Sequence, residues 1–453
     1  MKGMNGAPEG QNMRDGCTSR EVERMGREVS CLKDLPDGWK RVRLEDIISI
    51  YTGKSKSKYV SDYGSYIVVD MGAISADGKL IPNKKTDYNG DFLEYGDLVM
   101  PKDDIGGGNI IGKVAFIDRD NKYILGDHVF RLKVKEGYSL FLYYVINSEA
   151  VNSKLKRATT GTAQIGLKRK DVEELLILYP PLPEQRKIAE ILETIDNAIE
   201  KTDRIIEKYK QIKQGLMQEL LTKGIDENGQ IRSEETHRFR DSPLGRIPEE
   251  WEVVELRDIS FNITDGKHGD CQDEENSGYY FISAKDICND KIHYENARQI
   301  TKRDFEEAHK RTKLEPFDIV LTNSGTIGKI AVVKDQPETY KTTFQKSVAI
   351  IKLNKNLTSP YFIAQKLESI LKKLINESYG SAQQNLLLRD LRKLLIPLPP
   401  LQEQQHIAKI LTQIGNTIEK EQKYKEKLIK IKQGLMEDLL TGKVRVYHLI
   451  EGE

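Results

Sequence analysis

The stretch PPLPEQRKIAEIL, residues 180–192, recurs as PPLQEQQHIAKIL at residues 399–411, which is 219 positions later. Two other stretches recur around it. LPDGWKRVRLEDI at 35–47 matches IPEEWEVVELRDI at 247–259, and IKQGLMQELLT at 212–222 matches IKQGLMEDLLT at 431–441. Because these anchors keep their order, the sequence predicts that the chain is built from two copies of one folding unit.

Each copy begins with about 145 residues of mixed character. Short runs of β-branched and apolar residues alternate with Gly, Asn and Asp, which is typical of the strands of an α+β domain. In the first copy these runs are YIVVD, DLVM, VAFI and VFRLKV, at 66–70, 97–100, 114–117 and 129–134. We therefore predict an α+β fold for both copies.

A Pro-rich elbow closes each domain, at 179–183 and at 397–400. Proline is not tolerated in a helix interior, so each elbow marks where the next helix begins. Uninterrupted helical sequence then runs to about Leu221 and about Leu440. In the first copy it covers 38 residues, which span about 57 Å at 1.5 Å per residue. A helix of this length exceeds what is needed to cover a small domain.

Apolar residues recur at alternating spacings of four and three along both helices. Such a stripe has to be buried, and we predict that the two helices pack on each other as an antiparallel coiled coil. The alternative is two separate helices, each covering its own domain. The predicted seam contains Ile188, Leu192, Ile195, Ile199, Ile206, Tyr209, Leu216 and Leu220 in the first helix, and Ile407, Leu411, Ile414, Ile418, Leu428, Leu435 and Leu439 in the second.

The predicted fold class is therefore α+β, with two similar globular domains separated by two long helices packed as an antiparallel coiled coil, in a pseudo-two-fold internal repeat. The predicted segments are a mobile N-terminal extension at 1–34, a first domain at 35–180, a first spacer helix at 184–222, a linker at 223–246, a second domain at 247–399, a second spacer helix at 401–441 and a C-terminal tail at 442–453.

The overall charge excludes a uniformly basic nucleic-acid coat. The 453 residues include 71 Lys and Arg against 70 Asp and Glu, a formal net charge of +1. No apolar run approaches the roughly 18 residues of a membrane helix, and no signal segment opens the chain. Four cysteines are too few for a disulfide framework, which suits a reducing compartment. We expect a cytoplasmic protein with no membrane partner.

Positive charge is concentrated locally, at matching places in the two copies. Residues 151–170 hold six cations and no acid, and the equivalent residues 371–393 hold five cations and two acids. A solvated surface could carry one such run, but the recurrence favours nucleic acid, because Lys and Arg neutralise phosphates while Gln and Asn contact base edges. The candidate DNA-binding residues are Thr52, Lys54, Lys56, Lys58, Lys154, Arg157, Thr160, Gly161, Thr162, Gln164, Lys168, Arg169, Lys267, Asn323, Ser324, Lys346, Tyr379, Gly380, Ser381, Gln383, Gln384, Asn385 and Arg389.

The motifs that could indicate catalysis are incomplete. GGNIIGK at 107–113 resembles a phosphate loop, but Val114 follows where a Ser or Thr is required, so we predict a strand-turn-strand element. His268, Cys271, Cys288 and His293 have a spacing that superficially suits zinc, but the first copy lacks equivalent ligands, so no metal is predicted. We expect the other histidines, including His128, to pack or to face solvent. No catalytic residue is predicted.

These motifs together resemble the specificity subunit of a type I restriction-modification enzyme. The resemblance covers about residues 35–445 and rests on the P-x-x-W starts, the two PPLxEQxxIAxIL stretches and the two IKQGLMxxLLT stretches. It implies two target recognition domains, a conserved antiparallel spacer and a subunit without catalysis or cofactor of its own. It also implies binding of double-stranded DNA, of two methyltransferase subunits that hold S-adenosylmethionine, and of restriction subunits that use ATP and Mg. The implied DNA site is bipartite and asymmetric, and the subunit directs adenine methylation or restriction.

The same resemblance suggests a base-contacting loop of the form GS-x-Q-x-N-L. In the second copy it matches Gly380, Ser381, Gln383, Asn385 and Leu386, whereas in the first copy Gly161, Thr162, Gln164 and Leu167 match and Gly166 replaces Asn. Two other classes of function stay open from the residues alone. One is a catalytic DNA-modifying enzyme, and the other is a scaffold whose two domains bind something other than duplex DNA.

Overall fold

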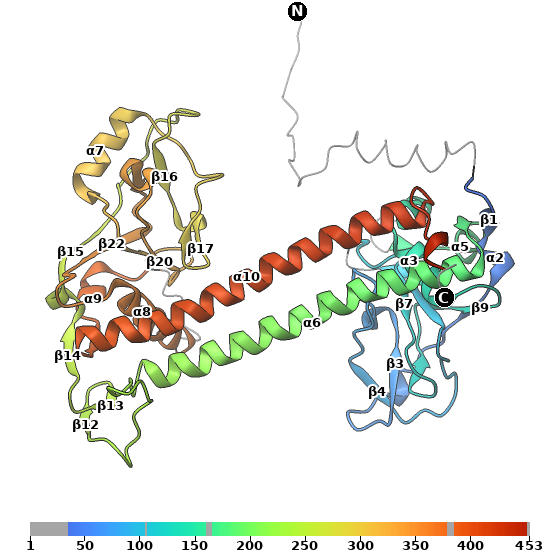
Figure 1. Cartoon of the computed structure of the whole chain (residues 1–453), viewed down its shortest axis with the longest axis horizontal. Helices are drawn as coiled ribbons and strands as arrows, with labels where there is room; N and C mark the ends of the chain where they lie inside the picture. The colour runs from blue at the N-terminus through green and yellow to red at the C-terminus, as the bar shows by residue number, and fades with distance from the viewer. Residues whose placement is uncertain (1–34, 105–106, 160–164, 378–384, 451–453) are drawn as a thin grey trace, which may run out of the picture. The chain divides into compact units, whose positions relative to one another are not determined.

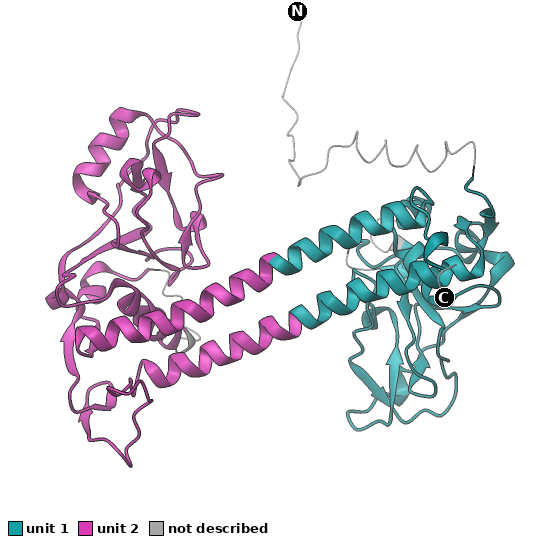
Figure 2. Ribbon diagram, viewed as in Figure 1, with its two compact units in different colours: residues 1–202, 424–453 teal, residues 203–423 magenta. Residues whose placement is uncertain are grey.

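The computed structural model describes residues 35–450 apart from 105–106, 160–164 and 378–384. The described chain divides into two compact units (Figure 2). Unit 1 contains the residues up to Thr202 and those from Tyr424 onward, and unit 2 contains Asp203–Lys423. Each unit therefore holds one globular domain and part of both long helices, so that each contains chain from both sequence copies.

Several elements of the first copy are labelled in Figure 1. They are β1 (Lys40–Arg43), α2 (Leu44–Ile47), β2 (Ile48–Thr52), η1 (Ser57–Tyr59), β3 (Tyr66–Val69), η2 (Met71–Ala73), β4 (Lys84–Thr86), β5 (Leu98–Pro101), β6 (Asp103–Asp104), β7 (Ala115–Phe116), β8 (Tyr123–Leu125), β9 (Val129–Val134), α3 (Ser139–Asn147), α4 (Glu149–Ala158), β10 (Ile165–Gly166), α5 (Arg169–Glu173), β11 (Leu176–Tyr179) and the long helix α6 (Leu182–Leu220).

The second copy continues in the same order, with additions. Its elements are β12 (Phe239–Ser242), β13 (Gly245–Pro248), β14 (Glu252–Glu255), η3 (Leu256–Ile259), β15 (Ser260–Asp265), β16 (Tyr280–Ile282), η4 (Ala284–Asp286), β17 (Ile287–Cys288), β18 (Lys291–Ile292), α7 (Lys302–Thr312), β19 (Ile319–Thr322), β20 (Ile330–Val332), η5 (Pro337–Lys341), β21 (Thr342–Phe344), β22 (Val348–Leu353), α8 (Pro360–Glu377), α9 (Leu388–Arg392), β23 (Leu395–Leu398), the long helix α10 (Leu401–Leu440) and η6 (Tyr447–Leu449).

The two units share one sheet topology. Unit 1 has the four-stranded antiparallel order β2-β9-β5-β7, and unit 2 has the equivalent order β15-β22-β19-β20. A parallel pair accompanies each sheet, β3 with β8 and β16 with β21. The predicted strand runs coincide with β3, β5, β7 and β9. The α+β prediction and the internal repeat are therefore confirmed.

A strand that begins beside the tryptophan of each repeated stretch pairs with the strand that leads into the Pro-rich elbow. β1 is antiparallel to β11, and β14 is antiparallel to β23. The following L-x-D-I sequence makes one tight turn in both units. Its Leu and Ile side chains are buried, and the carboxylates of Asp46 and Asp258 accept the N–H of Arg43 and Glu255. The first anchor thus closes the domain onto the start of the long helix.

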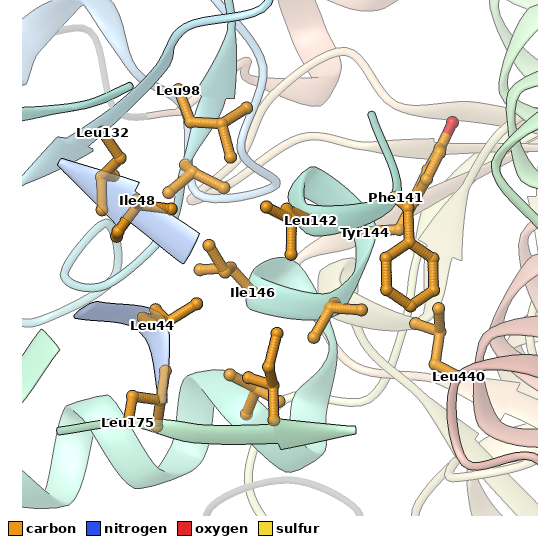
Figure 3. Packing of buried hydrophobic residues seen from close by; sticks show 14 of the residues in the cluster. Leu44, Ile48, Leu98, Leu132, Phe141, Leu142, Tyr144, Ile146, Leu175 and Leu440 are labelled. Carbon is orange, nitrogen blue, oxygen red and sulfur yellow. The ribbon is translucent and has the colours of Figure 1, made fainter. Parts of the chain in front are cut away.

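Each unit has a main core between its sheet, its helices and the long-helix ends. In unit 1 Leu44, Ile48 and Leu98 pack with Phe141 of α3, and Leu440 of α10 belongs to the same cluster (Figure 3). The equivalent cluster of unit 2 includes residues from η3, β15, β19 and α8 together with both long helices. The apolar faces of the long helices are therefore part of the domain cores.

The two long helices run antiparallel within each unit (Figure 2). In unit 1 the side chain of Asp196 on α6 pairs with Lys432 on α10 at 2.6 Å, and Leu192 packs in one cluster with Leu439. In unit 2 Leu220 packs in one cluster with Ile407. All the predicted seam residues are buried or half-buried, so the predicted antiparallel coiled coil is confirmed.

The Glu-Gln pair of each PPLxEQ stretch fixes the start of the long helix. In unit 1 the carboxylate of Glu184 accepts hydrogen bonds from Trp39 Nε1 at 2.9 Å and from Arg445 Nε at 2.8 Å. Gln185 donates to Pro180 O and accepts from the N–H of Tyr138. The side chain of Glu184 is only 1% exposed, so its two partners supply what water would otherwise give.

Unit 2 has the same arrangement, built from the second PPLxEQ stretch and the second P-x-x-W start. The carboxylate of Glu403 pairs with Arg232 at 2.5 Å and accepts from Trp251 Nε1 at 3.3 Å and from the N–H of Ile225 at 2.9 Å. Gln404 donates to Pro399 O. In both units the arginine comes from the segment that follows the other copy's long helix.

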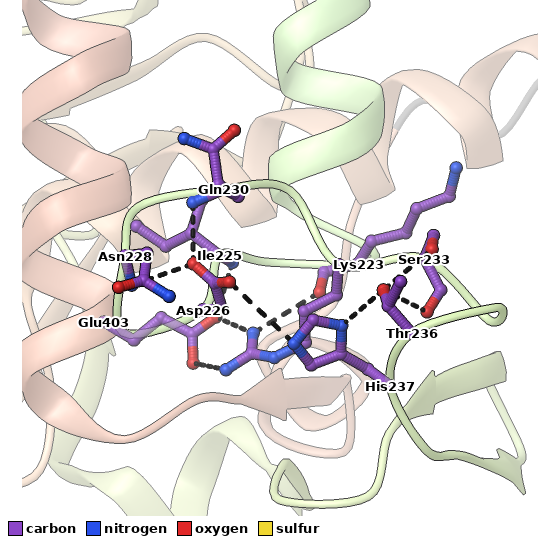
Figure 4. Close-up of polar contacts among 10 residues, drawn as sticks. Lys223, Ile225, Asp226, Asn228, Gln230, Ser233, Thr236, His237 and Glu403 are labelled. Atoms are coloured by element: carbon purple, nitrogen blue, oxygen red, sulfur yellow. Dashed lines mark hydrogen bonds and ion pairs between the residues drawn. The ribbon is translucent and has the colours of Figure 1, made fainter.

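The segment at 223–246, predicted as a linker, is more ordered than a plain connector. Ile225 and Arg232 are buried, and β12 and β13 form a hairpin. Figure 4 shows Glu403 beside Ile225 and the adjoining turn, in which the carboxylate of Asp226 accepts the N–H groups of Asn228 and Gln230. The polar sequence predicts only a linker. The segment is ordered because its polar residues bond to one another and to the buried carboxylate of Glu403.

We expect Arg232→Ala to lower the free energy of unfolding of unit 2 by about 3–5 kcal/mol, because it leaves the buried Glu403 carboxylate without its cation. Trp251 fluorescence in a Trp39→Phe background reports on this unit, since the chain has two tryptophans. The matched control is Arg246→Ala, whose ion pair with Glu234 is half exposed and should change stability by at most about 0.5 kcal/mol. Equal urea midpoints for the two variants would refute the assigned role of Arg232.

Candidate nucleic-acid interface

In unit 2, four segments that are distant in sequence meet at one end of the central sheet. Gly266, after β15, donates its N–H to Val348 O at 3.1 Å, and Asn323, after β19, donates to Ser347 O at 3.0 Å. Leu386 then donates to Asn323 O at 2.7 Å. We call this region the loop end of unit 2, and it consists of residues 266–267, 323–324, 345–347 and 385–386.

Unit 1 has the same loop end with the same hydrogen bonds. Gly53 donates its N–H to Val129 O at 3.2 Å, and Lys102 donates to His128 O at 3.0 Å. Leu167 donates to Lys102 O at 2.7 Å. The loop end of unit 1 consists of residues 53–54, 102–104, 126–128 and 166–167. Both copies of the fold therefore bring equivalent segments together.

A glycine is required where two of these segments cross. A Cβ added to Gly53 would lie 1.6 Å from Gly126 O, and one added to Gly266 would lie 2.1 Å from Phe344 O. No side chain fits at such distances, so the backbones approach closely only because both residues are glycine. The lysine that follows, Lys54 or Lys267, is thereby held at the loop end.

The structure brings together most of the described candidates of the second copy. Lys267, Asn323, Ser324, Lys346 and Asn385 all lie at the loop end of unit 2, and Arg389 lies exposed on α9. Ser324 Oγ donates to Asn385 Oδ1 at 2.5 Å. Lys346 is exposed, whereas the side chain of Lys267 is 16% exposed and its ammonium lies 3.6 Å from the carboxylate of Glu307. Their contacts with DNA stay predictions.

Asn323 has an unusual environment at this loop end. Its side chain is 8% exposed, and within the part of the chain that the structure describes its Oδ1 has no hydrogen-bond partner. A buried amide oxygen without a partner is unfavourable and is most often found where a ligand or water is expected. This observation supports the choice of Asn323 as a candidate.

In unit 1 the exposed candidates Thr52, Lys54 and Lys168 lie at or next to the loop end. Arg169 is exposed too, although its Nε donates to Glu173 at 2.7 Å. Two other exposed candidates, Lys58 and Arg157, lie on η1 and α4. Neither residue belongs to the segments that make up the loop end.

Lys56 needs a correction. Its side chain is 4% exposed, its ammonium lies 2.7 Å from Asp91 Oδ2, and it stands over the ring of Tyr88. It therefore stabilises the domain and is withdrawn as a phosphate contact. Lys154 is half-buried, and burial lowers the pKa of its ammonium, so it is a weaker candidate than its sequence suggests.

Nine candidates lie outside the described residues. They are Thr160, Gly161, Thr162, Gln164, Tyr379, Gly380, Ser381, Gln383 and Gln384.

Sequence reasoning missed two residues at the loop end of unit 1. Asp103 Oδ2 lies 2.7 Å from His128 Nδ1, and both side chains are partly exposed. His128 was expected only to pack or to face solvent. Aligning GDLVMPKDD at 96–104 with FDIVLTNSG at 317–325 would have placed Asp103 opposite the candidate Ser324, which was the available signal.

Neither of the other chemical motifs forms a site. Within residues 35–450, apart from the gaps given above, no group of three His, Cys, Asp or Glu side chains could hold a metal. His268 bonds to Asp265, and His293 lies 3.3 Å from Cys288 O. Lys113 of GGNIIGK donates to Asn147 O and burial lowers its pKa. The stretch lies between the short strand β6 and β7, and β7 pairs antiparallel with β5, so the predicted strand-turn-strand element is confirmed.

Comparison with known proteins identifies the family that has this architecture. The family model described as "Type I restriction modification DNA specificity domain" matches residues 36–211 and again 248–430. The chain belongs to this family. Its members are specificity subunits, which are not themselves catalytic, so catalysis lies with the partner subunits of the complex, as the sequence predicted.

Several relatives cover nearly the whole chain. The MjaVIII specificity subunit of Methanocaldococcus jannaschii is 30% identical over 429 residues, which is 92% of this chain and 95% of the relative. The EcoBI specificity subunit of Escherichia coli is 26% identical over 422 residues, 89% of this chain and 85% of the relative.

Solved structures agree in fold. The S subunit from M. genitalium superposes with a TM-score of 0.60 at 15% identity, over 90% of this chain and 98% of that one. A chain from a structure of type I R-M complex assembly and conformational transition gives 0.53 at 19% identity, over 91% and 100%. In the present chain, none of the described helices is long and apolar enough to cross a membrane.

Two lysines of one loop provide a matched test of the interface. We expect Lys54→Ala to weaken binding to every duplex alike and to reduce the slope of log affinity against log salt by about 1, because Lys54 is exposed and its predicted phosphate contact would release about one counterion. Lys56→Ala should leave that slope unchanged and lower the free energy of unfolding by about 1–3 kcal/mol, because its buried ammonium is lost. DNA binding at several salt concentrations measures the slope, and urea unfolding measures the stability of each variant. A changed salt slope for Lys56→Ala would show that Lys56 contacts phosphate after all.

Proposed function

We propose that each domain of this specificity subunit recognises one half of a bipartite, asymmetric site in double-stranded DNA. The observation that carries the proposal is the loop end, which has the same backbone hydrogen bonds in both units and different side chains. A shared backbone presents residues to a groove in the same way, while different side chains select different bases. Exposed lysines at or beside both loop ends suit the adjacent phosphates.

The coiled coil sets the distance between the half-sites in this proposal. Both helices are continuous, from Leu182 to Leu220 and from Leu401 to Leu440, and their seams are buried or half-buried. A paired helix resists bending more than a linker of equal length does. Two half-sites on one face of DNA lie about 34 Å apart per helical turn, within the roughly 57 Å that a helix of this length spans.

The same helices dock two methyltransferase subunits, one for each copy of IKQGLM. Ile212 and Ile431 are 39% and 50% exposed. Gly215 and Gly434 follow on each helix, and a Cβ at either would meet no atom within 4 Å. Glycine in a helix interior costs about 1 kcal/mol relative to alanine. Among the described residues, no neighbouring atom requires glycine at these two positions, which supports close approach by a partner.

The complete complex then directs adenine methylation or restriction. The methyltransferase subunits carry S-adenosylmethionine, and the restriction subunits use ATP and Mg. The chain itself contributes no cofactor, and the complex acts in the cytoplasm.

The direct test is selection from a library of randomised duplexes, using the full chain together with its methyltransferase subunits. The proposal expects two short, unrelated sequences separated by a fixed gap. Binding without any preferred sequence would instead favour a scaffold role.

Lengthening both helices tests the role of the coiled coil in spacing. We expect seven residues inserted after Glu207 and after Glu421 to keep the seam in phase and to add about 10 Å. The selected gap should grow by about three base pairs, at about 3.4 Å each, with both half-sites unchanged. The control places the same insertion in the exposed turn between Ser242 and Gly245. An unchanged gap in the lengthened chain would contradict the spacing role.

Replacing the exposed glycines tests the docking surface. We expect the double variant Gly215→Leu, Gly434→Leu to be at least as stable as the parent chain, because leucine favours helix and meets open space. Its methyltransferase subunits should bind far more weakly, as measured by co-sedimentation. The control is Lys201→Leu, Lys420→Leu, fourteen residues earlier on each helix and also exposed. Normal assembly by the glycine variant would place the docking surface elsewhere.

A further inference from the structure

The loop ends of the two units carry different chemistry at three equivalent positions. The backbone hydrogen bonds of Lys102 and Asn323 show which positions correspond. The carbonyl of each residue accepts from the N–H of a leucine, and the N–H of each donates to the carbonyl of the residue just before β9 or β22. The correspondence pairs Asp103 with Ser324, His128 with Ser347, and Gly166 with Asn385. The backbones are alike, so the differences lie in what each unit presents to a ligand.

Asp103 and His128 form a held pair in unit 1. Their Oδ2 and Nδ1 atoms are 2.7 Å apart, and the side chains are 20% and 45% exposed. His128 has a φ of +59°, a left-handed conformation that is uncommon for a residue other than glycine. Backbone conformations of this kind concentrate at functional sites. Here the turn aims the imidazole at the Asp103 carboxylate.

Gly166 leaves space in front of this carboxylate. It lies opposite Asp103 across the β6–β10 pair, and a Cβ added to Gly166 would be 3.5 Å from Asp103 Oδ1. In unit 2 the equivalent Asn385 fills that place and accepts a hydrogen bond from Ser324 Oγ. The absence of a side chain at 166 therefore keeps the Asp103 carboxylate accessible. It also accounts for the departure of the first copy from the GS-x-Q-x-N-L pattern.

The pair in unit 1 offers an acceptor. A carboxylate oxygen accepts hydrogen bonds, so His128 Nδ1 donates to Asp103 Oδ2, and Asp103 Oδ1, which faces Gly166, is left as an acceptor. Acceptors match the amino groups that cytosine and adenine present in the major groove, and they oppose the oxygens of guanine and thymine. Lys102 Nζ, 3.8 Å from Asp103 Oδ2, offsets the repulsion between the carboxylate and nearby phosphates.

The equivalent position in unit 2 offers a donor. Asn385 Oδ1 accepts from Ser324 Oγ, so the remaining hydrogen-bonding group of this exposed amide is its Nδ2 donor. A donor matches the acceptors N7 and O6 of guanine, N7 of adenine and O4 of thymine. The two units therefore differ in the sign of the hydrogen bond they offer at one place in the fold.

We propose that Asp103 and His128 are the specificity-determining pair of unit 1, and that they restrict one position of its half-site to a base with an amino group, cytosine or adenine. This inference rests on the proposed function, since it names the chemical class of base that the first domain selects.

The test grafts the chemistry of unit 2 onto unit 1. The triple variant Asp103→Ser, His128→Ser, Gly166→Asn is compared with the parent chain in selection from randomised duplexes, each with its methyltransferase subunits. One position of the unit 1 half-site should lose its preference for cytosine or adenine by about tenfold or more. The unit 2 half-site and the gap should be unchanged. The control Asp77→Ser removes a partly exposed carboxylate in another turn and should alter nothing.

Each outcome decides one question. A parent chain that selects no sequence would overturn the proposed function and this inference with it. A parent chain that selects a bipartite site which the graft leaves unaltered would overturn only the pair. If the graft fails to fold by Trp39 fluorescence, Asp103→Asn replaces it. That variant keeps the size of the side chain and adds a donor, so it should admit guanine or thymine at the same position; unchanged selection overturns the pair.

Discussion

Two buried carboxylates, Glu184 and Glu403, fix where the domains meet the long helices. A carboxylate that is removed from water must be paired and hydrogen-bonded, or its burial costs several kcal/mol. Glu184 meets this demand with Trp39 and Arg445, and Glu403 with Trp251 and Arg232. Each carboxylate thus holds three parts of the chain together. They are the tryptophan just before the domain's first strand, the start of the long helix that carries the glutamate, and the segment after the other long helix, which carries the arginine. Neither sequence copy contains all three, so each unit is completed by chain from both.

The sequence predicts those parts of the fold that local pattern determines. Strand runs such as VFRLKV have their own periodicity, and β9 follows that run from Val129 to Val134. The helical seam also appears in the sequence because apolar side chains are spaced to lie on one face. The repeat identifies Glu184 and Gln185 as important, but not the atoms they bind. Their partners include Trp39 and Arg445, which lie 145 and 261 positions away, and no local pattern links such distant residues.

The candidate site was predictable to a lesser degree, because charge in a sequence does not report exposure. Lys54 and Lys56 look alike in TGKSKSKYV, yet one is exposed and the other is buried against Asp91. Asp103 was overlooked for the opposite reason, since an acidic residue argues against a phosphate contact and only its place beside His128 suggests contact with a base. The order within the linker segment at 223–246 could not be predicted from its polar sequence, because polar groups there bond to one another.

The loop ends of the two domains share a backbone and differ in their side chains, and in the proposed function this difference is what gives the two domains different specificities. Equivalent backbone hydrogen bonds agree within about 0.1 Å between the units, at 3.2 and 3.1, 3.0 and 3.0, and 2.7 and 2.7 Å. Packing and backbone pairing therefore do not depend on the side chains at 103, 128 and 166, or at their counterparts. A net charge of +1 fits the same division of labour. Phosphate attraction favours all duplexes equally. In the proposed function, a chain with little surplus charge would therefore contribute mainly selectivity, and its partner subunits would supply much of the non-specific affinity.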